Sequence, residues 1–232
     1  MAANPDRLPQ AVIFDLDGTL ADSLPDIASA LNSALAQAGM TPLAEQTVRT
    51  MVGNGSEILV ERAILEAGAG RAPAGAAGKI HAAFLAAYDL APCVHTCLYA
   101  GARDVLVALA SQGVALGVCT NKPQHITAGV LDRLGIAPLF GSVVGGNATD
   151  PLKPEPAMLR RVLQELAAEP SLSVMVGDSG ADARAARAAG TALILLQHGY
   201  CQEDLADLGA DAVLPGFAGL PDALVRVTRQ PV

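Results

Sequence analysis

The 232-residue chain has no tryptophan, and aromatic residues make up only 3% of it. Charged residues are also few (16%), and 15 Lys and Arg against 23 Asp and Glu give a net charge of −8. Nucleic acids and anionic membranes are bound by concentrated basic surfaces, so we expect neither as a partner. An anionic small molecule must then be held locally, by a metal ion, a few cations or backbone N–H groups.

The sequence also lacks a long uninterrupted apolar run. A membrane-spanning helix needs roughly 18 or more apolar residues, and the first apolar run, at 11–14, is broken at once by Asp15. A secretory signal would need a longer apolar stretch and a small-residue cleavage site. We therefore expect a soluble cytoplasmic protein, with a monomer and a homodimer both open.

Cysteine is scarce as well, with four residues at positions 93, 97, 119 and 201. Cys93, His95 and Cys97 lie close enough to raise the question of zinc. Structural zinc takes four ligands, usually as two spaced pairs, and no second pair follows. We expect thiols rather than disulfides in a reducing compartment, and leave the role of Cys93 and Cys97 open.

Short continuous apolar runs alternate with amphipathic segments along most of the chain. Continuous rather than alternating apolar strands, separated by helices, indicate a parallel sheet covered on both faces. We predict an α/β fold with a doubly wound parallel sheet, a Rossmann-like core. The predicted strands are 11–14, 114–119, 142–144, 174–176, 192–196 and 212–213, and the predicted helices are 103–110, 126–134, 157–168, 182–189 and 220–228.

Between residues 24 and 91 this alternation stops and only helical patterns occur. Ser23 and Pro25 mark a helix entry, as a capping serine followed by an early proline. Gly39 marks the end of that helix, Ser56 opens another, and a further helical pattern runs over 79–91.

This helical stretch predicts a second domain. Its tract at 68–78 is rich in glycine and alanine, and we predict a flexible loop between helices there. The resulting division has a catalytic core at 1–21 and 95–232 and a helical cap domain at 22–94. Because the cap follows the first strand directly, it lies over the strand ends where open α/β sheets bind ligands.

Two predicted strands end in pairs of carboxylates. Asp15 and Asp17 follow the first strand, and Asp178 and Asp182 follow the strand at 174–176. Asp15 and Asp17 both face the crevice if the strand runs straight, whereas a turn after Asp17 would swing its side chain nearby. Carboxylates this close repel unless a cation or a proton lies between them. Hard oxygen ligands favour Mg²⁺, so we predict a metal site completed by Asp178.

Two further strand ends carry groups suited to a phosphate. Thr120 and Asn121 end the strand at 114–119 with a hydroxyl and backbone donors, which suit phosphoryl oxygens. Lys153 follows the strand at 142–144 and supplies positive charge. Each feature alone is common in ordinary turns, but together the four strand ends predict phosphoryl transfer. Receiver-type signalling domains, which only accept a phosphoryl group, share such strand ends but lack the long helical insert.

The strings FDLDGTLADS, VCTNK, LKPEP and GDSGAD resemble the four ordered motifs of the haloacid-dehalogenase-like hydrolases. The resemblance covers nearly the whole chain, and the helical insert is similar to the cap of these enzymes. The strings SLPDIASALNSALAQAGM, VGNGSEILVERAI and CLYAG resemble bacterial phosphoglycolate phosphatases. The segment at 145–153 and the glycine-rich tract differ from those enzymes, which weakens the inference about the substrate.

The resemblance implies a mechanism. Asp15 would attack phosphorus and form an aspartyl-phosphate, and Asp17 would protonate the leaving alkoxide and then activate water. Thr120 and Lys153 would hold the phosphoryl oxygens. Mg²⁺ would be bound by the Asp15 carboxylate, the Asp17 backbone carbonyl and Asp178, with Asp182 in support.

The resemblance also implies a small phosphate monoester as substrate, 2-phosphoglycolate first. The alternatives are a phosphatase for a sugar or amino-sugar phosphate and a phosphoglucomutase-like transferase. We predict that the cap sets this choice near Gly53 and Asn54, where a Gly-Asn-Gly turn tolerates left-handed backbone angles. Such a turn exposes N–H groups and the Asn54 amide to a small carboxylate or hydroxyl.

Overall fold

A six-stranded parallel sheet forms the centre of the structure, a computed structural model that describes residues 8–68, 75–146 and 149–228. Its strand order is β5-β4-β1-β6-β7-β8, with the first strand of the chain in the interior. All six strands lie where the sequence predicts them, which confirms the doubly wound α/β class. The strands are β1 (Ala11–Phe14), β4 (Ala115–Pro123), β5 (Ser142–Gly146), β6 (Ser173–Gly177), β7 (Ala192–Leu196) and β8 (Ala212–Leu214).

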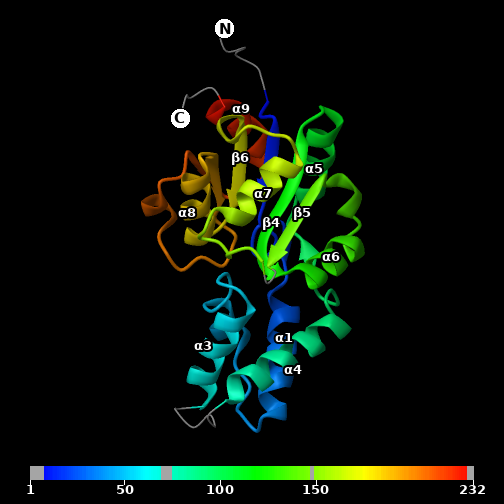
Figure 1. Cartoon of the computed structure of the whole chain (residues 1–232), viewed down its shortest axis with the longest axis vertical. Helices are drawn as coiled ribbons and strands as arrows, with labels where there is room; N and C mark the ends of the chain where they lie inside the picture. The colour runs from blue at the N-terminus through cyan, green and yellow to red at the C-terminus, as the bar shows by residue number, and fades with distance from the viewer. Residues whose placement is uncertain (1–7, 69–74, 147–148, 229–232) are drawn as a thin grey trace.

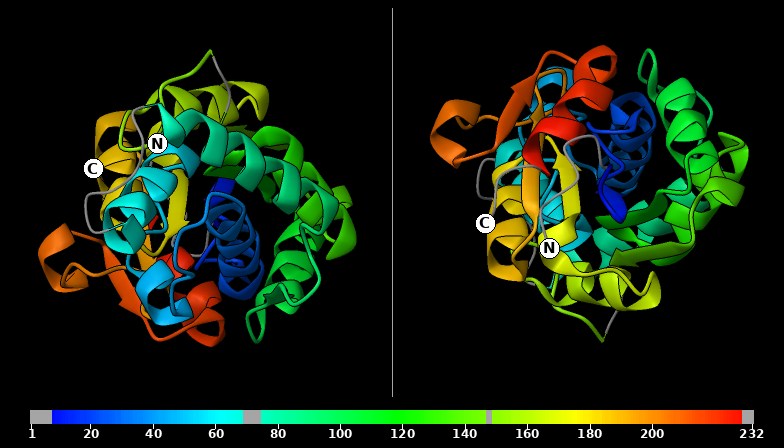
Figure 2. Two further views of the ribbon diagram at one scale, coloured as in Figure 1. Left: turned by 90° about the horizontal axis from the view of Figure 1, so that it is seen from below. Right: turned by 90° about the horizontal axis from the view of Figure 1, so that it is seen from above.

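Helices cover both faces of the sheet, as the views along its strands in Figure 2 show. In β1, Val12 and Phe14 point to one face, and Ala11 and Ile13 to the other. All four are fully buried, which explains why the strand reads as a continuous apolar run. The first face is covered by α5 (Ala102–Ser111), α6 (Gln124–Arg133) and α9 (Leu220–Val227), and the second by α7 (Ala157–Glu165) and α8 (Gly180–Ala189).

A group of helices lies beyond the carboxyl ends of the strands, at the bottom of Figure 1. They are α1 (Leu24–Gln37), α2 (Glu45–Arg49), α3 (Ser56–Gly68) and α4 (Ala76–Leu90). The described residues between 24 and 91 contain no strand, as predicted, and form the helical cap. The short α2 was not predicted, because five residues are too few to show a periodicity.

The predicted loop at 68–78 is shorter than expected. Helix α3 extends to Gly68 and α4 begins at Ala76, so both ends of this tract are helical. Alanine is the strongest helix former, which explains why α4 takes up the Ala-rich end. Residues 69–74 lie outside the described part of the chain.

A small ribbon that the sequence did not predict joins the sheet to the helices. It pairs β2 (Ala21–Asp22) with β3 (Cys97–Leu98) in antiparallel fashion. The two connections between cap and core therefore run side by side. Strands of two residues carry no pattern to read. The remaining short elements are 3₁₀ turns at Ala137–Leu139, Pro170–Leu172, Leu205–Leu208 and Phe217–Gly219.

The start of α1 differs from the predicted serine cap. Ser23 precedes the helix, but its hydroxyl makes no cap and donates to Asp17 Oδ1 at 2.5 Å. The hydroxyl of Tyr200 takes over instead, accepting from the N–H groups of Ser23 (2.8 Å) and Leu24 (3.0 Å). The end of α1 is as predicted, with Gly39 at a positive φ of 71°. No helix in the described residues is long and apolar enough to cross a membrane.

Candidate active site

The predicted acids meet at the carboxyl edge of the sheet, where it faces the cap (Figure 1). Asp15 follows β1, and Asp178 and Asp182 follow the adjacent β6. One oxygen from each of these three buried carboxylates lies within 4.8 Å of the others. This is the candidate metal-ligating cluster found in the described residues, so Cys93 and His95 form no zinc site there.

Asp15 belongs to this cluster and is held by three donors. Its Oδ1 accepts from the N–H of Leu16 at 2.7 Å and lies 3.1 Å from Lys153 Nζ. Burial raises the pKa of Asp15 to about 6, and the charge of Lys153 opposes that rise. A hydrogen bond from Thr120 lowers the pKa further. Lys153 and Thr120 thus stabilise the ionised form of Asp15, which a carboxylate nucleophile requires.

Asp178 is closely surrounded by the chain at Thr19 and Tyr200. Its Oδ1 accepts from the Thr19 hydroxyl at 2.8 Å, and its Oδ2 accepts from the N–H of Tyr200 at 2.7 Å. A Cβ added at Gly199 would lie 2.2 Å from the Asp178 carboxylate, and one at Gly18 would lie 2.6 Å away, so both glycines are required by this close approach.

The electrostatics of Asp178 fit a bound cation. Burial raises its pKa to about 8, with further contributions from the nearby charges of Asp182 and Asp15. Ionising all three acids together is therefore costly. A divalent cation with a preference for hard oxygen ligands would remove that cost.

Asp182 is fully engaged within the protein. Its Oδ1 contacts Lys153 Nζ at 2.6 Å. Its Oδ2 accepts from the N–H groups of Asp178 (3.2 Å) and Ser179 (3.1 Å) and from the Ser179 hydroxyl (2.7 Å), forming the capping box of α8. These contacts suit a supporting role.

Lys153 and Asn121 hydrogen-bond to each other next to the end of β4. Lys153 is buried, and its Nζ also donates to the Cys119 carbonyl at 2.7 Å. The Asn121 amide donates to the carbonyls of Gly53 (2.9 Å) and Lys153 (2.8 Å), and its Oδ1 accepts from the N–H of Lys153 (2.8 Å). Both N–H donors of the Asn121 side chain are thus used inside the protein, so the predicted substrate contact of this residue remains with its backbone. They fix the Lys153 loop to the cap.

Asp17 lies outside the cluster of three acids. The chain turns at Gly18, whose φ is +82°, and the Asp17 side chain faces Lys122 instead. Lys122 Nζ lies 2.9 Å from Asp17 Oδ1 and 3.2 Å from Oδ2. The two acids of the first motif therefore have separate cations, Lys153 for Asp15 and Lys122 for Asp17.

Three residues of the site were not predicted. Lys122 and Tyr88 contact each other, with the ammonium 4.3 Å from the ring centroid and hydrogen-bonded to the hydroxyl. The position of Lys122, directly after Thr120 and Asn121, was the available signal. Tyr200 had none, because its hydroxyl partners at 22–24 are far away in the sequence.

Two connected hollows separate these residues from the cap. The inner cavity has a volume of about 40 Å³ and the outer groove about 220 Å³. Asp15, Asp17 and Gly53 line both. The predicted turn has the expected angles, with φ of 115° at Gly53 and 91° at Gly55. Asn54 lines the outer groove only.

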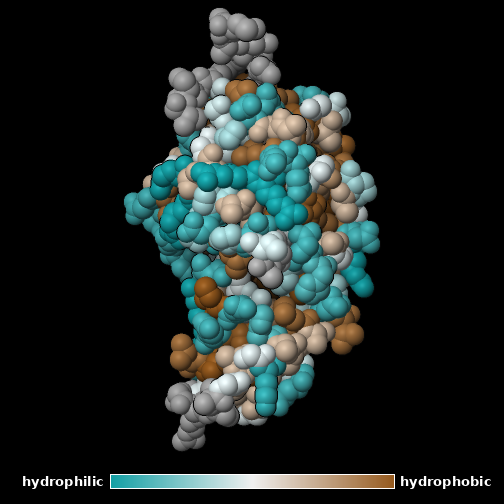
Figure 3. Space-filling view, in the orientation of Figure 1, coloured by the Kyte–Doolittle hydropathy of each residue, from teal (hydrophilic) through white to brown (hydrophobic). Residues whose placement is uncertain are grey.

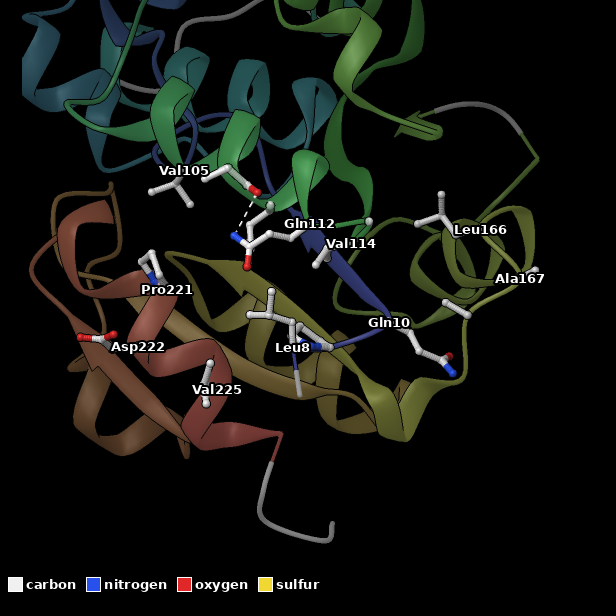
Figure 4. A pocket seen from close by; sticks show the side chains of 15 residues that line it. Leu8, Gln10, Val105, Gln112, Val114, Leu166, Ala167, Pro221, Asp222 and Val225 are labelled. Atoms are coloured by element: carbon white, nitrogen blue, oxygen red, sulfur yellow. Dashed lines mark hydrogen bonds between the residues drawn. The ribbon is translucent and has the colours of Figure 1, made fainter. Parts of the chain in front are cut away.

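A more voluminous cavity of about 870 Å³ opens at the opposite edge of the sheet, as Figure 4 shows. Its walls combine apolar side chains such as Val105 and Val114 with the amides of Gln10 and Gln112. Among the described residues that line it, Asp222 is the one that carries a charge. The chemistry described above belongs to the other edge, where the acids and lysines converge.

Sequence comparison identifies relatives over nearly the whole chain. A phosphoglycolate phosphatase from Rhodospirillum rubrum is 45% identical over 220 residues, which cover 94% of this chain and 91% of the relative. A phosphoglycolate phosphatase from Caulobacter vibrioides is 36% identical over 216 residues, covering 93% and 91%.

Solved structures agree with these relatives. The crystal structure of a predicted phosphoglycolate phosphatase from Haemophilus somnus superposes with a TM-score of 0.87 at 33% identity, over 92% of this chain and 96% of that one. CbbY from Rhodobacter sphaeroides, solved with phosphate, superposes with a TM-score of 0.76 at 26% identity, over the same shares. The family model described as haloacid dehalogenase-like hydrolase matches residues 9–190. The chain belongs to the haloacid dehalogenase-like hydrolases and is similar to their phosphoglycolate phosphatases.

Proposed function

We propose that this phosphatase hydrolyses 2-phosphoglycolate to glycolate and phosphate through an aspartyl-phosphate on Asp15. The observation that carries the proposal is the buried contact between the Asp15 carboxylate and Lys153, beside the Thr120 hydroxyl. The names of the relatives support the substrate. The division into a core at 1–21 and 95–232 and a cap at 22–94, and a cytoplasmic location, are part of the same proposal.

In the first step, an oxygen of Asp15 attacks phosphorus while the bond from phosphorus to the ester oxygen breaks. A carboxylate and a phosphate dianion repel each other, and Lys153 offsets this repulsion from within the protein. Thr120 donates to a phosphoryl oxygen. Asp17, which lines the cavity together with Asp15, gives a proton to the departing oxygen.

In the second step, Asp17 takes a proton from water as the water oxygen attacks phosphorus. The bond from phosphorus to Asp15 breaks, which returns the carboxylate and releases phosphate. The same group thus acts as acid and then as base. Ser23 and Lys122 hold Asp17 in place for both steps.

The residues present fit a divalent cation. The carboxylates of Asp15 and Asp178 and the backbone carbonyl of Asp17 would hold Mg²⁺, which prefers such hard oxygen ligands. The bound ion supplies positive charge that lowers the repulsion between nucleophile and phosphate. Asp182 keeps Lys153 and the backbone before α8 in position.

The experiment that tests the substrate is a comparison of kcat/KM across phosphate esters. We expect 2-phosphoglycolate to exceed glucose 6-phosphate and glucosamine 6-phosphate by about tenfold or more, because the inner cavity beside Asp15 and Thr120 has a volume of only about 40 Å³. Incubation with β-glucose 1-phosphate, followed by a search for an isomerised product, tests the transferase alternative. A sugar phosphate that is turned over faster, or isomerised, would overturn the proposal.

A further inference from the structure

The two buried lysines of the site have different surroundings. Lys153 lies between Asp15 and Asp182, next to the proposed phosphate position. Lys122 lies on the other side of Asp17 and lines the inner cavity, which Lys153 does not. Phosphate binding therefore accounts for Lys153, whereas Lys122 holds Asp17 and in addition lies on the cavity wall.

The inner cavity is placed to receive the alcohol half of a substrate. It is bounded by Asp15 and Thr120, so a group attached to a phosphorus held between them can extend into it. Its volume of about 40 Å³ has room for about three water-sized groups. A carboxymethyl group is of that size, whereas a sugar ring is much larger.

The walls of this cavity divide by polarity. The apolar side comes from the cap, with Ile27, Leu59 and Phe84. The polar side combines Lys122 and Tyr88, both buried, with Asp17, which Lys122 contacts. In the first step Asp17 carries the proton for the leaving group, which leaves the charge of Lys122 for another anion, and the low-polarity surroundings strengthen that attraction.

Lys122 and Tyr88 together offer donors to such an anion. Tyr88 accepts a hydrogen bond from Lys122 and so keeps its own O–H as a donor. Burial raises the pKa of Tyr88, which keeps that O–H protonated. Burial alone would lower the pKa of Lys122, but Asp17 and Tyr88 raise it above its ordinary value, so the ammonium remains charged.

We propose that Lys122 and Tyr88 form an anion subsite that binds a carboxylate on the alcohol half of the substrate, so that the enzyme selects phosphate esters of small hydroxy acids. The inference rests on the proposed phosphatase function and gives it a physical basis for substrate choice. It also moves the main determinant of that choice from the Gly53–Asn54 turn to the junction of β4 and α4.

Two substrates of equal carbon number test the subsite. 2-Phosphoglycolate and ethyl phosphate both release a two-carbon alcohol, and they differ in the carboxylate. We expect the wild type to prefer 2-phosphoglycolate by about a hundredfold in kcat/KM, as for a buried, charge-assisted contact. In Lys122→Met the preference falls at least tenfold, although both rates drop because Asp17 loses its partner. Tyr88→Phe lowers the preference by a smaller factor.

The ratio of the two kcat/KM values shows whether Lys122 binds the substrate carboxylate or only positions Asp17. If Lys122 only orients Asp17, both esters lose the same factor and the preference stays as in the wild type, which overturns the subsite. The matched control is Lys79→Met, an exposed lysine of α4, which leaves rates and preference unchanged. Thermal unfolding checks that each variant is folded.

A second measurement does not depend on turnover by the variants. Glycolate should inhibit ethyl phosphate hydrolysis by the wild type competitively, and propanol at equal concentration should not. Equal inhibition by both overturns the subsite. A wild type that hydrolyses both esters without preference also overturns it but leaves the phosphatase standing. A wild type that hydrolyses neither contradicts the proposed function itself.

Discussion

The carboxyl edge of the sheet and the cap that faces it are built differently. At the sheet edge each acid is fixed by polar partners, as for Asp178, which is held by Thr19 and the Tyr200 backbone. The cap presents mostly apolar side chains to the cavity, such as Leu59 and Phe84. The groups proposed for the chemistry are therefore preorganised in one part of the molecule, while the shape of the leaving-group cavity comes from the other.

The solvent-exposed surfaces of the cap and the core also differ in polarity. Five large hydrophobic side chains are exposed in the described residues, and four belong to the cap or its connection, namely Ile58, Leu65, Leu90 and Val94. Hydrophobic patches are visible over the cap helices at the bottom of Figure 3. Polar contacts also join the cap to the core, among them those of Tyr200 with Asp22 and of Lys122 with Tyr88. Arg49 donates to the Gly199 carbonyl and stacks on Tyr200, and Asn121 donates to Gly53.

The largest loss of activity should come from a substitution within the catalytic core. Asp15→Asn keeps the size of the side chain but removes the nucleophile, so kcat should fall by about a thousandfold or more. Folding should survive, because the charge repelled by Asp182 and Asp17 is gone. Steady-state kinetics and thermal unfolding measure both, with Asp222→Asn as a control at the opposite edge of the sheet. Activity above about a tenth of wild type would rule out Asp15 as nucleophile.

Metal removal should come next in size. Excess chelator should lower kcat about a hundredfold or more, and Mg²⁺ should restore it. Ca²⁺ should inhibit in competition with Mg²⁺, because it accepts bidentate carboxylates and would occupy both Asp15 oxygens. Full activity in chelator, or in Ca²⁺ alone, would show that the acid cluster does not work through Mg²⁺.

The same cluster predicts how stability depends on pH. The pKa values of Asp15 and Asp178, about 6 and about 8, lie above the ordinary value of 3.8, so the folded state binds protons more tightly than the unfolded state. The contribution of these groups to the free energy of unfolding, without metal, therefore falls as pH rises from about 4 to about 8.

Magnesium should reverse this loss. At a hundred times its Kd, Mg²⁺ should raise Tm by about 5–10 °C at pH 8 and by much less at pH 5, where protons already occupy Asp178. Differential scanning fluorimetry with and without Mg²⁺ measures the difference. Asp178→Asn should abolish it, and an equal shift at both pH values would contradict the assignment of the site.

A smaller effect is expected where the two regions meet. Tyr200→Phe removes the hydroxyl that accepts from the N–H groups of Ser23 and Leu24 and donates to Asp22 at 2.7 Å. Leaving such donors unpaired should lower the free energy of unfolding by about 1–3 kcal/mol. The looser start of α1 should also lower kcat/KM by about tenfold. Denaturant unfolding and kinetics test this, and an unchanged kcat/KM would mean that the cap is held without Tyr200.

The smallest effect should lie in the cap. Asn54→Ala should lower kcat/KM for 2-phosphoglycolate by less than about tenfold, since Asn54 lines the outer groove and a neutral hydrogen bond contributes about 1 kcal/mol. The rate with ethyl phosphate should change little. A loss larger than that of Lys122→Met would move the specificity site back to the turn.

Much of the fold could be predicted from local patterns. The six strands and the helices between them follow from apolar runs and helical periodicity, because burial on both faces requires such runs. Asp15 and Asp178 were found because each directly follows a strand, and Asp17 and Asp182 because they come shortly after them. Boundaries and short elements such as α2 and the β2–β3 ribbon were missed, since a few residues carry no periodicity.

The sequence by itself determined which groups lie at the carboxyl edge, because in a parallel sheet every strand ends there. Only the tertiary structure decided how they pair. Asp17 is matched with Lys122 and Asp15 with Lys153, and Tyr200 instead of Ser23 caps α1. Tyr200 and Asp22 are separated by 178 residues, and Lys122 and Asp17 by 105. A hydrogen-bonding side chain can serve several partners equally well, so the pairing depends on which segments the packed core brings within about 3 Å.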